Sequence, residues 1–213
     1  MSYLIENSVL PLHRNWDLSQ MVGADNIQEI QQNILQYLNN PEVFTQANNL
    51  YIYSDNNGNG KSRAANWIVE QLHQPRLQAN GTILTTTFAI VSFTEYLKFC
   101  GNFKISDEQA RERIMTVPIL LLDDVSAAFG SNNLHTDRRE LLSLMKYRRE
   151  HMLITIITSN LTPAAFDKVY GPTASSKALE NFSYIEVRGA DVRQAIYPDQ
   201  FQDPGEEDEE ACR

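Results

Sequence analysis

Eight residues, Asp55 to Ser62 (Asp-Asn-Asn-Gly-Asn-Gly-Lys-Ser), constrain the fold of this chain more than any other stretch. A phosphate-binding loop requires a strand, a glycine-rich turn that ends in Gly-Lys-Ser or Gly-Lys-Thr, and then a helix. The apolar run 49–54 predicts a buried strand before the loop, and residues 63–72 place apolar side chains at helical spacing after it. Taken alone, the octet could also be a chance glycine-rich turn before a helix.

The loop supplies the three groups that bind the phosphates of a nucleotide such as ATP. Its glycines let backbone N–H groups turn inward around phosphate oxygens, Lys61 adds a positive charge for the β- and γ-phosphates, and Ser62 offers a hydroxyl ligand to Mg²⁺. The first position of the motif, usually Gly, is Asp55 here, so the turn must accommodate a side chain. The candidate cofactor-binding residues are Asn57, Gly58, Asn59, Gly60, Lys61, Ser62 and Arg63.

A second polar site follows the aliphatic run 118–122, which ends in Asp123 and Asp124. A near-continuous apolar run is typical of a central parallel strand that is covered on both faces, and ligands bind beyond the carboxyl ends of such strands. We expect Asp123 to hold Mg²⁺ and Asp124 to polarise the water that attacks the γ-phosphate. An isolated Asp-Asp pair could also be a strand-ending turn, but the Gly-Lys-Ser loop on an earlier strand favours the nucleotide interpretation.

A third apolar run, 152–157, leads into Thr158-Ser159-Asn160. If this strand is parallel to the other two, its polar end lies at the same edge of the sheet, where the Asn160 amide can orient the attacking water or contact the γ-phosphate. Asn160 could instead cap the next turn, although Thr162 followed by Pro163 is a better helix start. Strands alternating with helices predict an α/β fold with a parallel sheet and right-handed crossovers.

Charge and length limit the partners that the chain can bind. The net charge is −9, and the segment 203–213 holds six acids and one base, so nonspecific binding to nucleic acid through bulk positive charge is excluded. DNA contacts would need local basic clusters, and the candidates are Arg111 with Arg113, Arg138 with Arg139, and Lys146 with Arg148 and Arg149. Each cluster could also be an ordinary solvated helix face. No apolar run approaches a membrane span of about 20 residues, and no signal peptide is recognisable, so we expect a cytoplasmic protein without membrane contact.

The 213 residues divide into three predicted parts. Residues 1–40 form a lead-in with an amphipathic helix from Ile27 to Leu38, because apolar side chains recur there at three- and four-residue steps. Residues 41–198 form the α/β core, and residues 199–213 form an acidic tail whose composition predicts disorder.

Together the motifs resemble the AAA+ ATPases of the DnaC/DnaI helicase-loader and IstB transposase-helper group. The resemblance covers about residues 10–195 and rests on Leu122-Asp-Asp-Val125, on Thr158-Ser-Asn160, and on a closing block with Tyr170-Gly171, Ser176–Glu180 and Ile185–Arg193. It implies a P-loop three-layer sandwich with a central parallel sheet, the AAA+ core, with little or no separate lid domain. About 50 residues precede the loop, which is short for a helicase-binding domain, so a phage or mobile-element version is expected.

The resemblance also implies action between subunits, and here the chain departs from the family. The closing block of the family usually carries a Ser-Arg pair whose arginine reaches the ATP of the neighbouring subunit, and the matching residue is Lys177, which lacks the planar fork of arginine. Lys177 is nevertheless the expected catalytic residue from the adjacent subunit, with Arg188 and Arg193 as candidates for the remaining basic roles toward the nucleotide. A homo-oligomer in the ATP state is therefore expected.

The sequence leaves three functions open. The leading hypothesis is a Mg²⁺-dependent ATPase that assembles on single-stranded DNA or on a replicative helicase and helps to load it. The second is an ATP-binding adaptor or transposase helper that scarcely hydrolyses ATP, which the departures at Asp55 and Lys177 favour and the intact Asp123-Asp124 pair opposes. A small-molecule kinase is the weakest, because no segment is evident for its lid and substrate-binding arginines.

Overall fold

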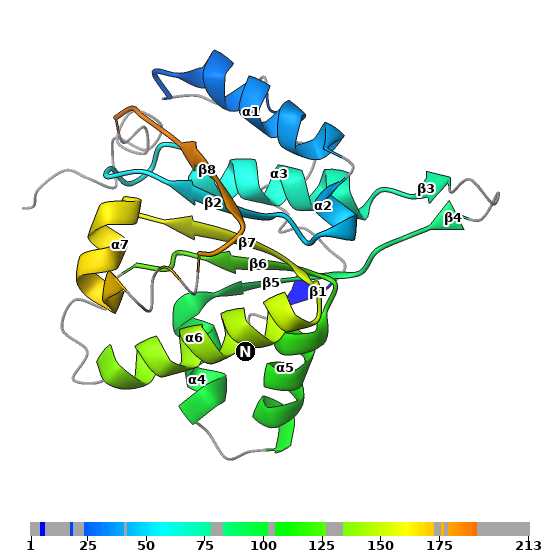
Figure 1. Cartoon of the computed structure of the whole chain (residues 1–213), viewed down its shortest axis with the longest axis vertical. Coiled ribbons are helices and arrows are strands. Elements are labelled where there is room, and N and C mark those ends of the chain that lie inside the picture. The colour runs from blue at the N-terminus through cyan, green and yellow to red at the C-terminus, as the bar shows by residue number, and fades with distance from the viewer. Residues whose placement is uncertain are drawn as a thin grey trace, which may run out of the picture.

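In the computed structural model, the described residues are 5–6, 18, 24–40, 42–77, 83–101, 105–126, 134–172, 176 and 179–190. They form a three-layer α/β sandwich, in which a central sheet lies between helices on both faces (Figure 1). The elements are, in chain order, β1 (Ile5–Glu6), α1 (Ile27–Asn39), α2 (Glu42–Thr45), β2 (Asn49–Tyr53), α3 (Lys61–His73), β3 (Arg76–Leu77), β4 (Ile83–Leu84), β5 (Phe88–Ser92), α4 (Phe93–Gly101), α5 (Ile105–Thr116), β6 (Ile119–Asp123), α6 (Leu134–Glu150), β7 (Ile154–Ser159), α7 (Pro163–Tyr170) and β8 (Phe182–Glu186).

Five strands of the main sheet are parallel and run in the order β5-β6-β7-β2-β8, and β1 pairs antiparallel with the outer edge of β5. The strand that precedes the glycine-rich loop, β2, therefore lies between β7 and β8, and β6 lies on the other side of β7. The predicted parallel α/β core is confirmed. The expectation of little or no separate lid domain stays a prediction, because it concerns residues outside those described.

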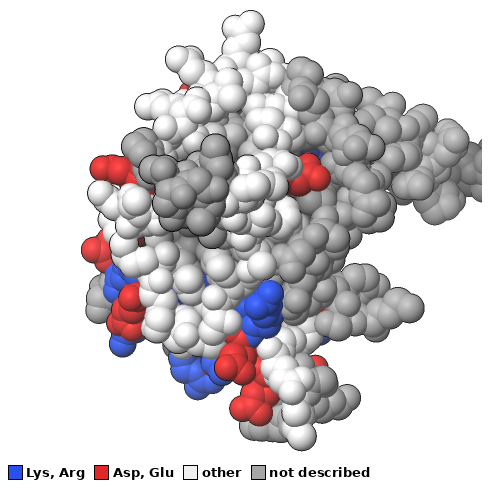
Figure 2. Space-filling model, turned by 90° about the vertical axis from the view of Figure 1, so that its right-hand side faces the viewer, with Lys and Arg blue, Asp and Glu red and all other residues white. Residues whose placement is uncertain are grey.

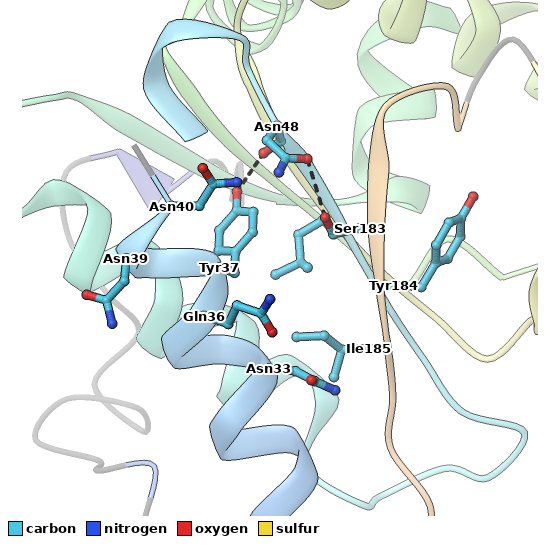
Figure 3. A pocket seen from close by; sticks show the side chains of 10 residues that line it. Asn33, Gln36, Tyr37, Asn39, Asn40, Asn48, Ser183, Tyr184 and Ile185 are labelled. Carbon is cyan, nitrogen blue, oxygen red and sulfur yellow. Dashed lines mark hydrogen bonds between the residues drawn. The ribbon is translucent and has the colours of Figure 1, made fainter. Parts of the chain in front are cut away.

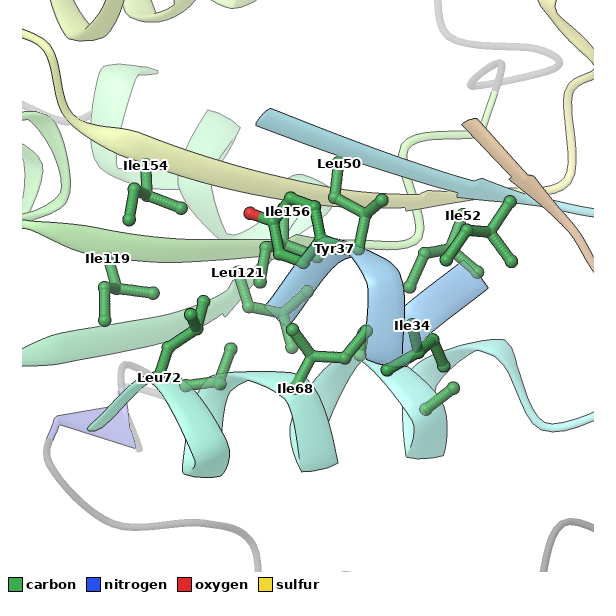
Figure 4. Close-up of a cluster of buried hydrophobic side chains, with 14 of the residues drawn as sticks. Ile34, Tyr37, Leu50, Ile52, Ile68, Leu72, Ile119, Leu121, Ile154 and Ile156 are labelled. Carbon is green, nitrogen blue, oxygen red and sulfur yellow. The ribbon is translucent and has the colours of Figure 1, made fainter. Parts of the chain in front are cut away.

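The central strands are apolar along their whole length because both faces of the sheet are covered. Along β6, Ile119 and Leu121 face the layer of α1 and α3, whereas Leu120 and Leu122 face the layer of α4 to α7. All four side chains are fully buried. Figure 4 shows the first of these two cores, in which side chains of α3 interlock with those of the strands above it. This burial explains the continuous aliphatic runs from which the sequence predicted central strands.

The predicted amphipathic helix in the N-terminal part is α1. Its buried residues, Ile30, Ile34 and Tyr37, belong to the same core as α3 and β2, and the Tyr37 hydroxyl donates to the backbone oxygen of Asn48 at 2.8 Å. The helix thus packs into the body of the domain. The division at residue 40 and the acidic tail stay predictions, and residues 199–213 lie outside the described residues.

Two features of the fold carried no sequence signal that we used. One is the antiparallel edge strand β1, which has only two residues. The other is the pair β3 and β4, which projects from the body of the molecule as a narrow ribbon (Figure 1). Within the described part of the chain, no helix combines the length and the hydrophobicity that crossing a membrane requires.

The basic clusters are largely neutralised, and one member is buried. Arg111 and Arg139 both form ion pairs with Glu140, at 3.3 and 3.0 Å, and Arg149 pairs with Glu180. Figure 2 shows one face of the molecule, on which cationic and acidic side chains lie next to each other over the lower half. Arg148 is only 1% exposed, so its inclusion among possible DNA contacts was wrong.

Arg148 instead joins three elements through the interior. Its guanidinium donates to five oxygens at 2.6–3.2 Å, which belong to Ile114, Met115, Val117, Ile154 and the Thr155 hydroxyl. The first three oxygens lie at the end of α5 and in the turn after it, and the others lie in β7. Burial lowers the pKa of Arg148 to about 9, which leaves it charged at neutral pH. The side chain therefore satisfies backbone carbonyls that the turn between α5 and β6 leaves without partners.

We predict that Arg148→Met lowers the free energy of unfolding by about 3 kcal/mol or more, because buried carbonyl oxygens lose their donors. Lys146→Met is the matched control. Its ammonium lies 3.9 Å from Glu150 with 69% of the side chain exposed, so we expect a loss below about 1 kcal/mol. Urea denaturation of the three proteins measures both values. Equal small losses would show that the buried guanidinium is dispensable.

Candidate functional site

The three predicted polar segments meet at the carboxyl edge of the sheet. The parallel register places Tyr53 of β2 opposite Ser159 of β7, and Leu122 of β6 opposite Ile157. Just beyond the strands, the Ser54 N–H donates to the Ser159 oxygen at 3.2 Å, and the Val125 N–H donates to the Thr158 oxygen at 2.8 Å. The glycine-rich loop, the carboxylate pair and Asn160 therefore share one edge.

Two glycines give the loop its shape and expose the start of α3. Gly58 and Gly60 have φ angles of 68° and 98°, in the left-handed region that favours glycine. Gly60 is also the residue that caps α3, and no side chain accepts a hydrogen bond there. The first N–H groups of a 13-residue helix therefore point out of the loop without a side-chain cap, which is the arrangement that binds phosphate.

The loop is tied to the chain segment that follows β8. Asn59 is fully buried, and its amide donates to the Ser54 hydroxyl at 2.5 Å and to the Val187 oxygen at 3.1 Å. The Asn56 amide donates to the Gly189 oxygen at 3.0 Å. This structural role of the two asparagines could not be predicted from the motif, because they contact a chain segment that is distant in the sequence. They hold the loop in register with the end of β8.

Lys61 lies over the loop. Its side chain is largely buried, and Nζ donates to the Asn56 oxygen at 2.6 Å and to Asn59 Oδ1 at 3.2 Å. Ser62 and Arg63 follow in the first turn of α3 and are half-buried. The lysine ammonium is therefore held beside the open N-terminal turn of α3, where a phosphate would bind.

Asp55 does not distort the loop. Its side chain is exposed, and it is absent from the described non-glycine residues with positive φ, which are Ala47, Asp124, Met152 and Asn181. A side chain is therefore accommodated at a position where the motif usually has glycine.

Thr158 of β7 binds both aspartates, one through its carboxylate and the other through its backbone N–H. Its hydroxyl donates to Asp123 Oδ1 at 2.5 Å and accepts from the Asp124 N–H at 2.9 Å. The Asn160 amide donates to Asp124 Oδ1 at 3.3 Å, and the backbone of Asp124 is left-handed, with φ 55°. The sequence placed Thr158 in the polar cluster but missed this function. It orients the carboxylate of Asp123 and fixes the backbone of the left-handed residue Asp124.

The environment makes Asp124 more basic than an ordinary aspartate. Partial burial is the largest cause that raises the pKa of its carboxyl group, the charge of Asp123 raises it further, and Lys61 and Ser126 act in the opposite direction. Asn160 Oδ1 is buried without a hydrogen-bond partner among the described residues. A basic carboxylate beside an unused amide oxygen could hold a water molecule and accept its proton.

The donor set also fits a hydrated Mg²⁺ that binds together with a nucleotide. Among the described residues, no cluster of three or more His, Cys, Asp and Glu side chains could hold a metal by itself. Mg²⁺ usually takes only one or two protein ligands and completes its shell with water and phosphate oxygens. The hydroxyl of Ser62 and the carboxylate of Asp123 are ligands of that kind, at the start of α3 and at the end of β6.

The basic side chains that the sequence predicts near the nucleotide are not brought to the site by the described residues. Lys177 and Arg193 lie outside the described residues, so their roles stay predictions. Arg188 follows β8, and its guanidinium pairs with Glu29 of α1 at 2.6 Å and with Glu186 at 3.4 Å. To reach a nucleotide, Arg188 would have to leave both carboxylates.

Several solved structures of DNA replication proteins are similar to this fold. The DnaC helicase loader matches with a TM-score of 0.65 and 15% identity, over 84% of this chain and 100% of its own. DnaI matches with a TM-score of 0.61 and 19% identity, over 84% and 91% of the two chains. The replication initiator DnaA bound to AMPPCP and single-stranded DNA matches with a TM-score of 0.60 and 17% identity, over 84% of this chain and 51% of its own.

At these identities the matches establish the fold alone, which is the three-layer α/β sandwich with a central parallel sheet that the sequence resemblance predicted. Neither known protein-family profiles nor curated protein sequences match the chain.

We predict that Asp124→Asn is more stable than the parent at pH 7 and equal to it at pH 3. Because the folded chain raises the pKa of this carboxyl group above 3.8, ionisation costs stability above that pH, and the cost vanishes below it. Asparagine also tolerates the left-handed backbone and retains an oxygen for the Asn160 amide.

Urea denaturation at the two pH values measures the difference. As a control, Asp107→Asn should lower stability at pH 7 by about 0.5 kcal/mol, because this acid lies in the first turn of α5. A destabilised Asp124→Asn at pH 7 would contradict the raised pKa.

Proposed function

We propose that this chain is an ATP-binding AAA+ ATPase that acts in DNA replication as a helicase loader, assembling on single-stranded DNA and on a replicative helicase. One observation carries the proposal: the Gly-Lys-Ser loop, the Asp123-Asp124 pair and Asn160 converge at one edge of the sheet. The structural likeness to DnaC and DnaI, and to a DnaA that binds AMPPCP and single-stranded DNA, supports the biological setting.

In this proposal the loop binds the phosphates and the strand ends carry out hydrolysis. The open N–H groups of α3 and the Lys61 ammonium bind the phosphate oxygens. Ser62 and Asp123 hold Mg²⁺, which supplies positive charge against the phosphates when it is bound. Asp124 accepts a proton from the attacking water, and Asn160, whose amide donates to Asp124 Oδ1 at 3.3 Å, holds that carboxylate and contacts the γ-phosphate.

The oligomer is the second part of the proposal. Lys177 or Arg188 of one subunit would reach the ATP of its neighbour, and Arg193 would contribute to the nucleotide site. Arg188 is a candidate because its ion pairs with Glu29 and Glu186 are exposed, and exposed pairs contribute little stability. DNA would use the cations that remain accessible, and Arg138 is one, since it forms no ion pair with the other described residues.

The alternative is an ATP-binding adaptor or transposase helper that hydrolyses ATP very slowly. Lys177 favours this function, because an ammonium cannot donate two parallel hydrogen bonds to phosphate oxygens as an arginine guanidinium does. Asp55 no longer supports it, because its side chain is exposed and leaves the loop glycines in their required conformation.

We predict that Lys61→Ala weakens ATP binding at least about tenfold and abolishes turnover, because the variant loses a charge-assisted contact to phosphate. Lys98→Ala is the matched control. Lys98 lies on α4, exposed and paired with Glu95, so ATP affinity and turnover should match the parent. Calorimetry with a nonhydrolysable ATP analogue measures affinity, and phosphate release with and without single-stranded DNA measures turnover. Unchanged affinity in Lys61→Ala would refute the phosphate-loop assignment.

Asp124→Asn separates binding from hydrolysis in the same assays. We expect affinity within about threefold of the parent and turnover lower by about 100-fold or more, because the variant lacks the proton acceptor. DNA-stimulated turnover in the parent supports the loader. Tight binding by a parent that turns over no faster than Lys61→Ala supports the adaptor.

A further inference from the structure

Among the described residues, β8 forms the uncovered edge of the sheet. It pairs there with β2 alone, whereas the opposite edge of the parallel sheet, β5, is covered by β1. The Val187 N–H donates to the Tyr53 oxygen at 2.8 Å, and the Asn49 N–H donates to the Asn181 oxygen at 3.1 Å. Backbone groups alternate along a strand, so those of 182, 184 and 186 point away from β2.

The described part of the chain caps only the two ends of this edge. At the carboxyl end of β8, the Asn26 amide donates to the Glu186 oxygen at 2.9 Å and accepts from the Arg188 N–H at 3.0 Å. At the amino end of β8, the Phe182 N–H donates to the Leu179 oxygen at 3.3 Å. Between them, four backbone groups have no partner among the described residues: the Phe182 oxygen, the Tyr184 N–H and oxygen, and the Glu186 N–H.

The exposed strand also lacks the features that usually protect an edge. Short strands, prolines, bulges and charged side chains keep natural edges from pairing with other chains. From Phe182 to Ile185, β8 has none of these side chains and instead presents Tyr184 with 45% of its surface exposed. Glu186 is the first charged residue of the strand, at its last position.

Beside this edge lies a groove with a volume of about 520 Å³ between α1 and β8. Figure 3 shows Asn33 and Gln36 of α1 across the groove from Ser183 and Ile185 of β8, while Tyr184 points from the other face of the strand. Amides, hydroxyls and apolar groups line the groove, with no carboxylate, ammonium or guanidinium. Such a surface recognises peptide groups and uncharged side chains, because a buried charge would find no counter-charge.

A nucleic acid is a poorer occupant than a polypeptide. Phosphate groups need lysine or arginine, and the lining contains neither. An extended peptide needs a row of unpaired N–H and C=O groups on one side and small polar pockets for alternate side chains, and this edge offers both.

We propose that the free edge of β8 docks an extended, uncharged segment of a partner protein, which adds to the sheet as a strand and places alternate side chains in the amide-lined groove. The site runs along the edge of β8 and the side of α1, and no residue that lines its groove belongs to the nucleotide loop, so peptide docking there does not depend on the nucleotide chemistry. This peptide-binding surface is separate from the sequence motifs of the domain, which lie at the carboxyl ends of the strands.

A displayed library of random nine-residue linear peptides, selected on the full chain, tests the proposal. We expect uncharged peptides rich in β-branched and aromatic residues. Tyr184→Pro should weaken their binding about tenfold or more, because it removes an edge N–H that points away from β2. Tyr184→Thr, which keeps that N–H, should stay within about threefold.

Hydrogen exchange of the parent provides a readout that does not depend on either variant folding. The amides of Tyr184 and Glu186 should exchange rapidly in the chain alone and become protected when a selected peptide saturates it. Three results would overturn the proposal: no enriched peptide, equal binding by Tyr184→Pro, or protection of both amides before any peptide is added. The last result would mean that the chain or a second copy already fills the edge.

Discussion

The burial of three parallel strands on both faces is the constraint on which the rest of the structure depends. A strand covered by helices on both sides can keep polar side chains only at its ends, so β2, β6 and β7 are apolar in the middle and polar where they stop. Because the strands are parallel, their polar ends gather at one edge. The loop, the carboxylates and Asn160 become neighbours through the sheet rather than through the chain.

Buried polar side chains then fix both ends of β7 in place. At its amino end, Arg148 donates to the Ile154 oxygen, and Asn49 Oδ1 accepts from the Thr155 N–H at 2.7 Å. At its carboxyl end, the Thr158 hydroxyl bridges the carboxylate of Asp123, at the end of β6, and the backbone N–H of Asp124, just after it. These bonds satisfy buried polar groups and also orient the site, so the stability of the fold and the geometry of the site share the same contacts.

Charge is distributed so that the surface of the described core has few free cations. Glu140 alone neutralises Arg111 and Arg139, and Arg188 is held between Glu29 and Glu186. Partners that recognise this domain by bulk electrostatics are thereby disfavoured. In the proposed interactions, the uncharged groove along β8 and the N-terminal turn of α3 would instead use backbone hydrogen bonds, which depend on geometry more than on net charge.

The sequence by itself determined the central strands, several helices and the polar residues that meet at the site. Aliphatic runs predicted β6 and β7, periodicity predicted α1, and Thr162 before Pro163 predicted the start of α7, because each is a local preference written in neighbouring residues. Only the tertiary structure decided that Arg148 is internal, that Thr158 bridges two aspartates, and that Asn59 grips the end of β8. These contacts join residues 6 to 128 positions apart, and no local pattern can specify a partner that folding alone brings near.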